Sequence, residues 1–251
     1  ETVNTYVEAV RLLGQRTAEL HRALAAATDN PAFAPEPFSL LYQRSIYQSM
    51  RSAAIQTFQQ LRRHTARLDE GTRALVEQVL ARENTIIAVY RRLLHHLIPA
   101  KRIRCHGDYH LGQVLYTGRD FVIIDFEGEP ARPISERRLK RTPLLDVAGM
   151  LRSFLYAAYA VLHEHQQHGL ISDVERAERW LRYWYGWVAA IFLQGYLQTM
   201  EGSDLLPPDP DDLRAVLEAY LLDKALYEVR YELGHRPGWL SIPLRGVLEM
   251  S

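Results

Sequence analysis

Residues 104–130 read RCHGDYHLGQVLYTGRDFVIIDFEGEP, and the architecture predicted for the chain follows from this stretch. Two short runs rich in strand-forming residues, 114–116 and 121–124, lie on either side of a four-residue segment that contains Gly118. Apolar and β-branched residues on both sides of a short glycine-containing segment are typical of a β-hairpin. The sequence therefore predicts a hairpin near the middle of the chain.

Oxygen-bearing side chains flank this hairpin at both ends. Asp108 and Gln113 precede the first strand, and Asp125 and Glu127 follow the second. Antiparallel pairing of the two strands brings these flanks side by side. Carboxylate and amide oxygens suit Mg²⁺, which prefers one or two carboxylates together with phosphate oxygens and water. The pattern predicts a magnesium site at the open end of the hairpin.

The spacing of these residues matches the catalytic region of protein kinases. That region has an Asp that accepts the proton of the substrate hydroxyl, an Asn five residues later that binds Mg²⁺, and a second Asp further on. Here Asp108, Gln113 and Asp125 stand in that order. Gln in place of Asn keeps the amide oxygen but lengthens the side chain by one methylene. Two unrelated polar turns that cap a buried hairpin are the alternative interpretation.

These motifs carry a family resemblance. HGDYHLGQ (106–113) followed by DFEGEP (125–130) resembles the motifs of the aminoglycoside-phosphotransferase/choline-kinase superfamily. The Gln in place of Asn and the GEP after the acidic pair make the stretch similar to the maltokinases. The resemblance also covers LGQRTAELHRALA (13–25), RRLKRTPLLDVAGMLRSF (137–154) and DKALYEVRYELGHRPGWLSIPLRG (223–246), so it spans nearly the whole chain.

The resemblance implies a mainly α fold with a small β-hairpin, the C-terminal lobe of the protein-kinase-like fold. The chain lacks a glycine-rich strand-turn-strand with its phosphate-binding Lys, so the N-terminal ATP-binding lobe is expected to be absent from it. A separate lobe or a fused trehalose synthase-type domain is the expected partner. The expected parts of the lobe are a helical part at 1–99, the catalytic loop and metal-binding hairpin at 100–130, and a helical acceptor-binding part at 131–251.

The activity that the resemblance implies is a maltokinase reaction, in which the γ-phosphoryl group of ATP passes to the anomeric hydroxyl of maltose. The product, maltose 1-phosphate, belongs to glycogen and trehalose metabolism, the cofactors are ATP and Mg²⁺, and the lobe alone is expected to be inactive. Asp108 would accept the hydroxyl proton. The other implied roles are metal binding for Gln113, Asp125 and Glu127, and structural support of the site for His106 and Asp146.

Candidate sugar-binding residues lie mainly near the end of the chain. Lys224, Tyr227 and Tyr231 follow each other at i, i+3 and i+7, which places them on one face of a predicted helix. The resemblance implies that this stripe contacts maltose; the alternative is a packed Tyr pair with a Lys stretched across it. His110 and Tyr185 are further candidates for contact with the acceptor.

Apolar periodicity predicts the helices. The aromatic residues of the segment 173–199 are expected to be mostly core. Thr17, Glu19 and His21 are expected on a solvated helical face rather than in a site, and Gly234 is expected to end the last helix. The predicted helices are 2–27, 39–67, 70–98, 143–163, 173–199 and 210–233, with a polar loop at 131–142.

Composition limits the class of protein. The 251 residues are 47% hydrophobic and 24% charged, with 30 basic and 30 acidic side chains, so no nucleic-acid footprint is indicated. Cys105 is the single cysteine and is expected to be a buried, inert thiol, which fits a reducing cytoplasm. No membrane-spanning run is expected. The predicted location is cytoplasmic, without membrane or nucleic-acid partners.

Two other functions are compatible with the sequence. The first is another small-molecule kinase of the superfamily, acting on an aminoglycoside, choline or a different sugar. Lys224 disfavours the cationic acceptors among these, because they call for acidic or aromatic pockets. The second is a non-catalytic sugar-binding or docking module fused to a trehalose synthase-type enzyme.

Overall fold

The computed structural model describes residues 2–130, 132–171 and 173–250. It is mostly helical with two small antiparallel sheets, which confirms the predicted fold class. Its contacts divide the chain into two units. The first contains residues up to Glu36 together with Lys101–Leu206, and the second contains Pro37–Ala100 together with residues from Pro207 onward.

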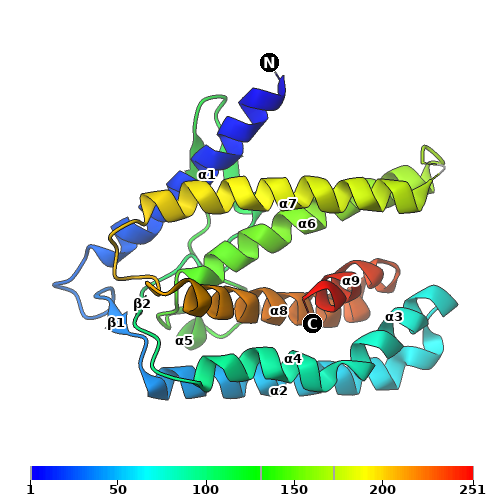
Figure 1. Ribbon diagram of the computed structural model, residues 1–251, viewed down its shortest axis with the longest axis horizontal. Helices are drawn as coiled ribbons and strands as arrows, with labels where there is room; N and C mark the ends of the chain where they lie inside the picture. Colours follow the sequence, from blue (N-terminus) through cyan, green and yellow to red (C-terminus); the bar gives the residue numbers. More distant parts are fainter. Residues whose placement is uncertain (1, 131, 172, 251) are drawn as a thin grey trace. The chain divides into compact units, whose positions relative to one another are not determined.

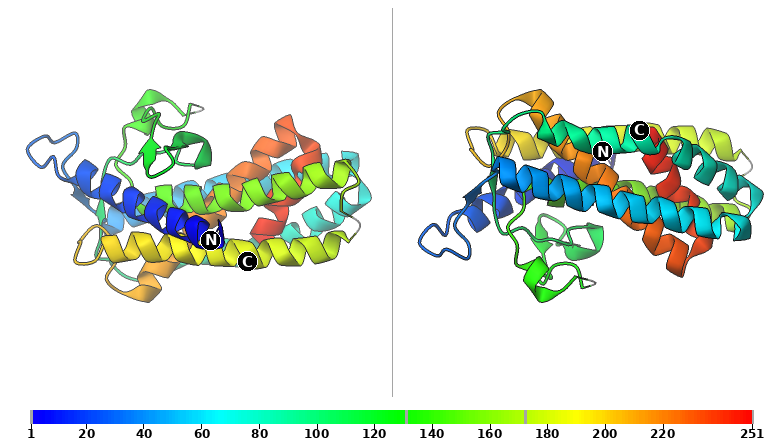
Figure 2. Two further views of the ribbon diagram at one scale, coloured as in Figure 1. Left: turned by 90° about the horizontal axis from the view of Figure 1, so that it is seen from above. Right: turned by 90° about the horizontal axis from the view of Figure 1, so that it is seen from below.

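The first unit contains three long helices and the hairpin. These helices are α1 (Thr2–Ala25), α6 (Leu144–Gln167) and α7 (Val174–Thr199). Within this unit α7 packs against both α1 and α6, as the ribbon views show (Figures 1 and 2). The smaller elements of the unit are β2 (Lys101–Arg102), a 3₁₀ turn at Leu111–Gln113, and α5 (Ile134–Arg137); β1 (Glu36–Pro37) pairs with β2.

The predicted hairpin is present, with β3 (Val114–Tyr116) antiparallel to β4 (Phe121–Ile123). Val114 lies opposite Ile123, and Thr117 donates its N–H to the carbonyl oxygen of Asp120 at 2.8 Å to close the turn. Arg16 of α1 reaches the turn and binds both carboxylate oxygens of Asp120, at 2.7 and 3.0 Å. The hairpin is therefore tied at its tip to the first helix.

Apart from turns, loops and Pro37 of β1, the described residues of the second unit are helical. Its core gathers apolar side chains of α2, α4 and α8, including Phe58, Leu61, Ile86, Tyr90 and Leu226. In this unit α8 packs against α2 and α9, and α3 packs against α9. The helices are α2 (Leu40–His64), α3 (Glu70–Ala81), α4 (Glu83–Arg91), α8 (Pro210–His235) and α9 (Ser241–Glu249), with 3₁₀ turns at Thr65–Arg67, Arg92–Leu94 and Pro237–Trp239.

Several predicted element boundaries are wrong. The single helix predicted at 70–98 is divided at Arg82, whose φ of −101° ends α3 and begins α4. The predicted polar loop 131–142 contains the short helix α5. The last long helix continues through Gly234 to His235, and α9 follows it although Pro243 and Gly246 weaken its helix signal.

The helix α6 differs from expectation in its hydropathy. Its span Leu144–Gln166 has a mean hydropathy of 1.3, so by length and composition alone it is able to cross a membrane. However, 61% of that span is buried within the structure, and Asp146 and Arg152 on it are buried as well. These are the properties of a buried core helix, because a polar side chain buried in protein requires polar partners there.

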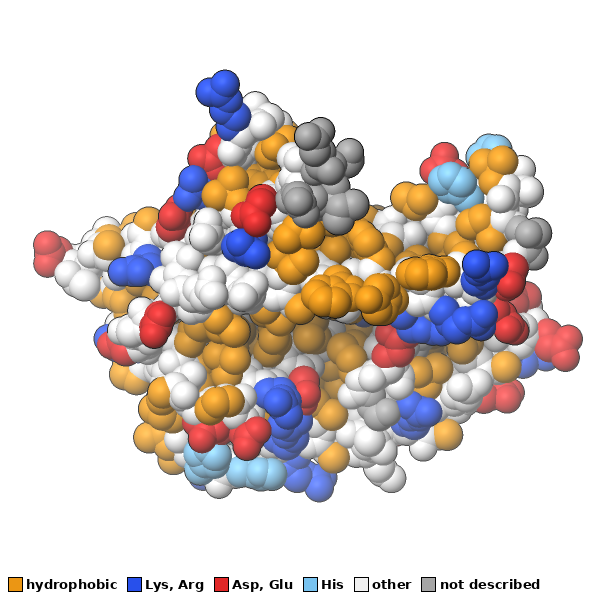
Figure 3. Space-filling view, turned by 45° about the horizontal axis from the view of Figure 1, so that its top comes forward, with side chains coloured by type: hydrophobic (Ala, Val, Ile, Leu, Met, Phe, Trp, Pro, Cys, Tyr) orange, Lys and Arg blue, Asp and Glu red, His pale blue; other side chains and the backbone are white. Residues whose placement is uncertain are grey.

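The aromatic residues of α7 are more exposed than expected. Trp180, Tyr183 and Trp187 are each more than half exposed, whereas Phe192 and Tyr196 are fully buried. Hydrophobic side chains accordingly form a broad patch on the face seen in Figure 3. Only the C-terminal half of α7 supplies core to the first unit.

Glycines at the crossing of α1 and α7 let the backbones of the two helices come into direct contact. A Cβ atom on Gly14 would lie 2.2 Å from the carbonyl oxygen of Phe192, and one on Gly195 would lie 2.3 Å from the carbonyl oxygen of Arg11. Any side chain at either position would force the helices apart. The close crossing of α1 over α7 therefore depends on both glycines.

We expect Gly14→Ala to lower the free energy of unfolding by roughly 2–3 kcal/mol, because two backbones must separate to admit the methyl group. Gly186→Ala on α7 is the matched control, since nothing lies within 4 Å of its added Cβ. This change should stabilise the protein by roughly 0.5–1 kcal/mol through helix propensity. Urea unfolding followed by circular dichroism measures both, and a similar effect of the two substitutions would contradict the packing described here.

Candidate functional site

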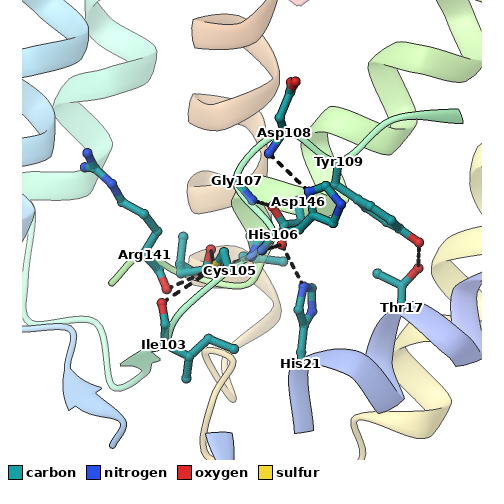
Figure 4. Close-up of polar contacts among 12 residues, drawn as sticks. Thr17, His21, Ile103, Cys105, His106, Gly107, Asp108, Tyr109, Arg141 and Asp146 are labelled. Atoms are coloured by element: carbon teal, nitrogen blue, oxygen red, sulfur yellow. Dashed lines mark hydrogen bonds and ion pairs between the residues drawn. The ribbon is translucent and has the colours of Figure 1, made fainter. Parts of the chain in front are cut away.

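The buried carboxylate of Asp146 is the anchor of the candidate site. It lies in the first turn of α6 and is 1% exposed. Its Oδ2 accepts the N–H of His106 at 2.8 Å, and its Oδ1 accepts the N–H of Gly107 at 2.9 Å (Figure 4). Gly107 has φ = +85°, a conformation that glycine adopts without strain. The loop that carries Asp108 is therefore held by two hydrogen bonds to one buried charge.

The first helix, α1, contributes two buried polar side chains next to this loop. His21 Nε2 lies 3.2 Å from Asp146 Oδ2, and His21 Nδ1 lies 2.9 Å from the hydroxyl of Tyr196 on α7. The hydroxyl of Thr17 lies 2.8 Å from that of Tyr109. The prediction that Thr17 and His21 face solvent is thus wrong, since both are completely buried.

A signal for this burial was present in the sequence. Val10, Leu13, Thr17 and His21 recur at intervals of three and four residues, so the two polar residues continue the apolar stripe of α1. Glu19 lies off this stripe and, with its side chain 53% exposed, is solvated as predicted. Sequence reasoning missed the stripe because the partners of the two polar residues lie on distant elements.

His106 links the loop to the hairpin. Its Nδ1 accepts the N–H of Asp108 at 3.4 Å, and its Nε2 lies 2.8 Å from the carbonyl oxygen of Ile124. Because Nδ1 is an acceptor and the carbonyl can only accept, the ring proton is on Nε2. The side chain of His106 therefore fixes the loop against the end of the second strand.

The carboxylate of Asp108 points away from these buried contacts (Figure 4). Its side chain is 20% exposed, and its Oδ2 lies 3.8 Å from Nε2 of His110. The His110 ring is held in turn, because its Nδ1 accepts the N–H of Gly112 at 3.1 Å. The structure thus brings Asp108 and His110 together at an accessible surface of the first unit.

The hairpin brings Gln113 and Asp125 together. Ile124 donates its N–H to the carbonyl oxygen of Gln113 at 3.0 Å, which extends the β3–β4 pairing by one step. The carboxamide nitrogen of Gln113 then donates to Asp125 Oδ2 at 2.9 Å. Asp125 has φ = +63° and is the one non-glycine residue with positive φ in the described part of the chain. A non-glycine residue adopts this left-handed conformation at some cost in free energy, and the hydrogen bond to Gln113 helps to hold Asp125 there.

This pair fits a hard cation by its chemistry. The Gln113–Asp125 contact uses the amide nitrogen of Gln113 and the Oδ2 atom of Asp125, so the amide oxygen and Oδ1 are not part of it, and Glu127 is exposed two residues further on. Within residues 2–130, 132–171 and 173–250 no three His, Cys, Asp or Glu side chains form a metal-binding group. A cation at this position would take its remaining ligands from phosphate oxygens and water, as Mg²⁺ does in nucleotide sites.

Cys105 lies in the approach to the loop. Its thiol donates to the carbonyl oxygens of Thr142 and Arg141 at 3.4 and 3.5 Å. Burial raises the pKa of the thiol well above its ordinary value, so it stays protonated and unreactive. These contacts hold the thiol, whereas Cys105 as a whole is partly buried rather than fully buried as predicted.

The predicted sugar-binding stripe lies on α8, in the second unit. The ammonium group of Lys224 lies 4.8 Å from the ring centroid of Tyr227. Tyr231 is 43% exposed and stacks on His235, with ring centroids 4.4 Å apart. Tyr185, by contrast, is half-buried on α7 of the first unit, the unit that also contains Asp108.

Comparison with known proteins shows which proteins this chain resembles. Residues 2–184 match the model of the phosphotransferase enzyme family. A glucosamine kinase of Mycolicibacterium smegmatis is 32% identical over 246 residues, which make up 96% of this chain and 53% of the relative. A glucosamine kinase of Streptacidiphilus jiangxiensis is 28% identical over 235 residues, or 92% of this chain and 46% of the relative.

Solved structures give a similar picture. A glucosamine kinase in complex with glucosamine, ADP and inorganic phosphate has a TM-score of 0.77 and 24% identity, covering 100% of this chain and 53% of that chain. Another glucosamine kinase structure, crystal form A, has a TM-score of 0.77 and 25% identity, covering 100% and 52%. The chain therefore spans about half the length of the relatives it matches.

We expect Asp146→Asn to lower the free energy of unfolding by roughly 3 kcal/mol, because the amide replaces a charged acceptor of two backbone N–H groups. Glu77→Gln makes the same chemical change at an exposed position of α3 and should leave stability unaltered. Urea unfolding of both variants measures the difference. Equal stabilities would show that the carboxylate of Asp146 does not hold the loop.

Proposed function

The chain belongs to the phosphotransferase enzyme family, and from this membership we propose that it is the catalytic lobe of an ATP-dependent sugar kinase. The observation that carries the proposal is the Gln113–Asp125 pair, which the hairpin places after the loop that presents Asp108. The order and chemistry of these three residues correspond to the proton acceptor and metal ligands of a phosphotransferase.

Each residue of the site has a proposed role. Asp108 accepts the proton of the acceptor hydroxyl, or orients that hydroxyl toward the phosphoryl group. Gln113 and Asp125 hold Mg²⁺ through their oxygens, with Glu127 as a further oxygen donor. The cation, when bound with ATP, neutralises charge on the transferred phosphoryl group. His106 and Asp146 keep the loop in place, and phosphoryl transfer depends mainly on such positioning.

We propose glucosamine as the first candidate acceptor. Both curated relatives named above are glucosamine kinases, and one of them is 32% identical across nearly all of this chain. ATP is the proposed donor, because a structural neighbour is described in complex with ADP and inorganic phosphate. The proposed site for the acceptor includes the accessible surface next to Asp108, with His110 and Tyr185 as candidate contacts.

Maltose is the second candidate acceptor, with maltose 1-phosphate as its product. The specific observation in its favour is Lys224, whose ammonium group lies over the ring of Tyr227 on the face that also carries Tyr231. An ammonium group on an acceptor-binding face would repel a protonated amino sugar, but it would donate hydrogen bonds to the hydroxyl groups of a neutral sugar such as maltose. The two candidate acceptors therefore predict opposite effects of removing this charge.

The partner of the lobe is also part of the proposal. An N-terminal ATP-binding lobe, or a fused trehalose synthase-type domain, would complete the enzyme, and this lobe alone would be inactive. The proposed location is the cytoplasm. A non-catalytic docking role would give the Gln113–Asp125 pair no function. We therefore favour the kinase function over a docking role.

In the intact protein, Asp108→Asn is expected to lower kcat by roughly 10²–10⁴-fold, the usual contribution of a positioned general base. The circular dichroism spectrum and unfolding midpoint should stay unchanged, because the side chain points away from the buried contacts. A phosphate-transfer assay with glucosamine, maltose, glucose, trehalose, choline and kanamycin measures the activity, with Glu77→Gln as the control. Retained turnover in the Asn variant would remove Asp108 from its proposed role.

Lys224→Met tests the acceptor. If glucosamine is the substrate, removal of a positive charge leaves the KM for glucosamine unchanged or lowers it. If maltose is the substrate and the stripe binds it, the KM for maltose rises by roughly tenfold through loss of a charged hydrogen bond. Steady-state kinetics with both sugars separates the two cases. Unchanged kinetics with maltose as the active substrate would exclude the stripe as its binding face.

A further inference from the structure

His21 is a buried imidazole placed between two side chains from different helices. Its ring lies 2.9 Å from the hydroxyl of Tyr196 on α7 and 3.2 Å from the carboxylate of Asp146 on α6. His21 and Tyr196 are both 0% exposed, and Asp146 is 1% exposed. No solvent or substrate reaches the imidazole, so it takes no direct part in chemistry.

The direction of the hydrogen bond between His21 and Asp146 is fixed by the carboxylate. Burial raises the pKa of Tyr196 well above its ordinary value, so the phenol keeps its proton. The carboxylate of Asp146 accepts hydrogen bonds from the amides of His106 and Gly107. Since a carboxylate can only accept, Nε2–H of His21 donates to Asp146, and Nδ1 of His21 shares a hydrogen bond with the hydroxyl of Tyr196.

The imidazole thus supplies a third hydrogen bond to the carboxylate that holds the catalytic loop. Asp146 Oδ2 receives one bond from the loop, at His106 N, and one from His21, which comes from α1. A buried carboxylate loses stability when a donor is removed, because no water replaces it. Removal of the His21 donor would allow Asp146 to reorient, and the loop one residue before Asp108 would move with it.

We propose that His21 is a positioning residue: it fixes the carboxylate of Asp146 and, through the backbone of His106 and Gly107, the position of Asp108. The proposal rests on the kinase function proposed above. This positioning role would belong to α1, which lies outside the sequence motifs around Asp108 and Asp125. Removal of the hydrogen-bond partner of a metal ligand commonly lowers activity by about 10–100-fold, and for a residue that acts through Asp146 we expect the lower end of that range.

Two conservative substitutions separate the two hydrogen bonds of the ring. The amide nitrogen of Gln occupies about the position of Nε2, so His21→Gln keeps a donor for Asp146. The amide of Asn reaches only the position of Nδ1, so His21→Asn keeps a partner for Tyr196 and loses the donor to Asp146. Phe192→Leu lowers the stability of the same core without touching this network, and it serves as the stability control.

Kinetics of the intact protein, measured well below the unfolding temperature of every variant, gives the test. His21→Asn should lower kcat by roughly tenfold, with the KM values for ATP and sugar changed by less than about threefold. His21→Gln should retain a kcat within about threefold of the wild type. If His21 only fills space, the kcat of all three variants stays at the wild-type value per folded molecule, and the proposal is overturned.

Hydrogen exchange of the backbone amides gives a readout that does not depend on activity. The amides of His106 and Gly107 should exchange faster in His21→Asn than in His21→Gln, while Phe192→Leu leaves their relative protection unchanged. Equal protection in the Asn and Gln variants would overturn the inference even in an active enzyme. Absence of sugar kinase activity in the wild-type protein would instead contradict the proposed function and leave the exchange result to decide the role of His21.

Discussion

A single buried carboxylate constrains the first unit of this protein. The negative charge of Asp146 is removed from water. The free-energy cost of burying this charge is offset only if hydrogen-bond donors surround it. Those donors come from two segments: the backbone of the loop at His106 and Gly107, and the side chain of His21 on α1. The start of α6, the loop and the first helix are therefore fixed relative to each other, since displacement of any of them leaves a buried group unsatisfied.

The hairpin adds a second constraint that meets the first at His106. Strand pairing sets Gln113 opposite Ile124, and the next residue, Asp125, turns into the left-handed region with its carboxylate on the Gln113 amide. The ring of His106 bonds to the carbonyl of Ile124, at the same step of the ladder. The loop with Asp108 and the pair with Asp125 thus share one support, although they lie on different segments.

The parts of this site that could be predicted from sequence are those set by local geometry. A hairpin with a short turn fixes which flanking residues meet, so the approach of Gln113 to Asp125 follows from the position of Gly118 and the strand residues. Thr17 and His21 could not be placed in this way, because their partners lie 92 and 125–175 residues away. The break at Arg82 and the helix α9 escaped prediction since packing overrides weak propensity there. The motifs pointed to the correct superfamily, but motifs that its members share do not encode which sugar is bound.

The two segments of the first unit are separated by about sixty residues that belong to the second. During synthesis the ribosome delivers α1 long before the helices that cover it, because the chain emerges from its N-terminal side. The face of α1 with Gly14, Thr17 and His21 thus stays open to water, chaperones and proteases until α7 has been translated. This unit cannot close before α7 has been translated, and in a nascent chain that stops before Tyr196 the imidazole of His21 lacks the partner that α7 supplies.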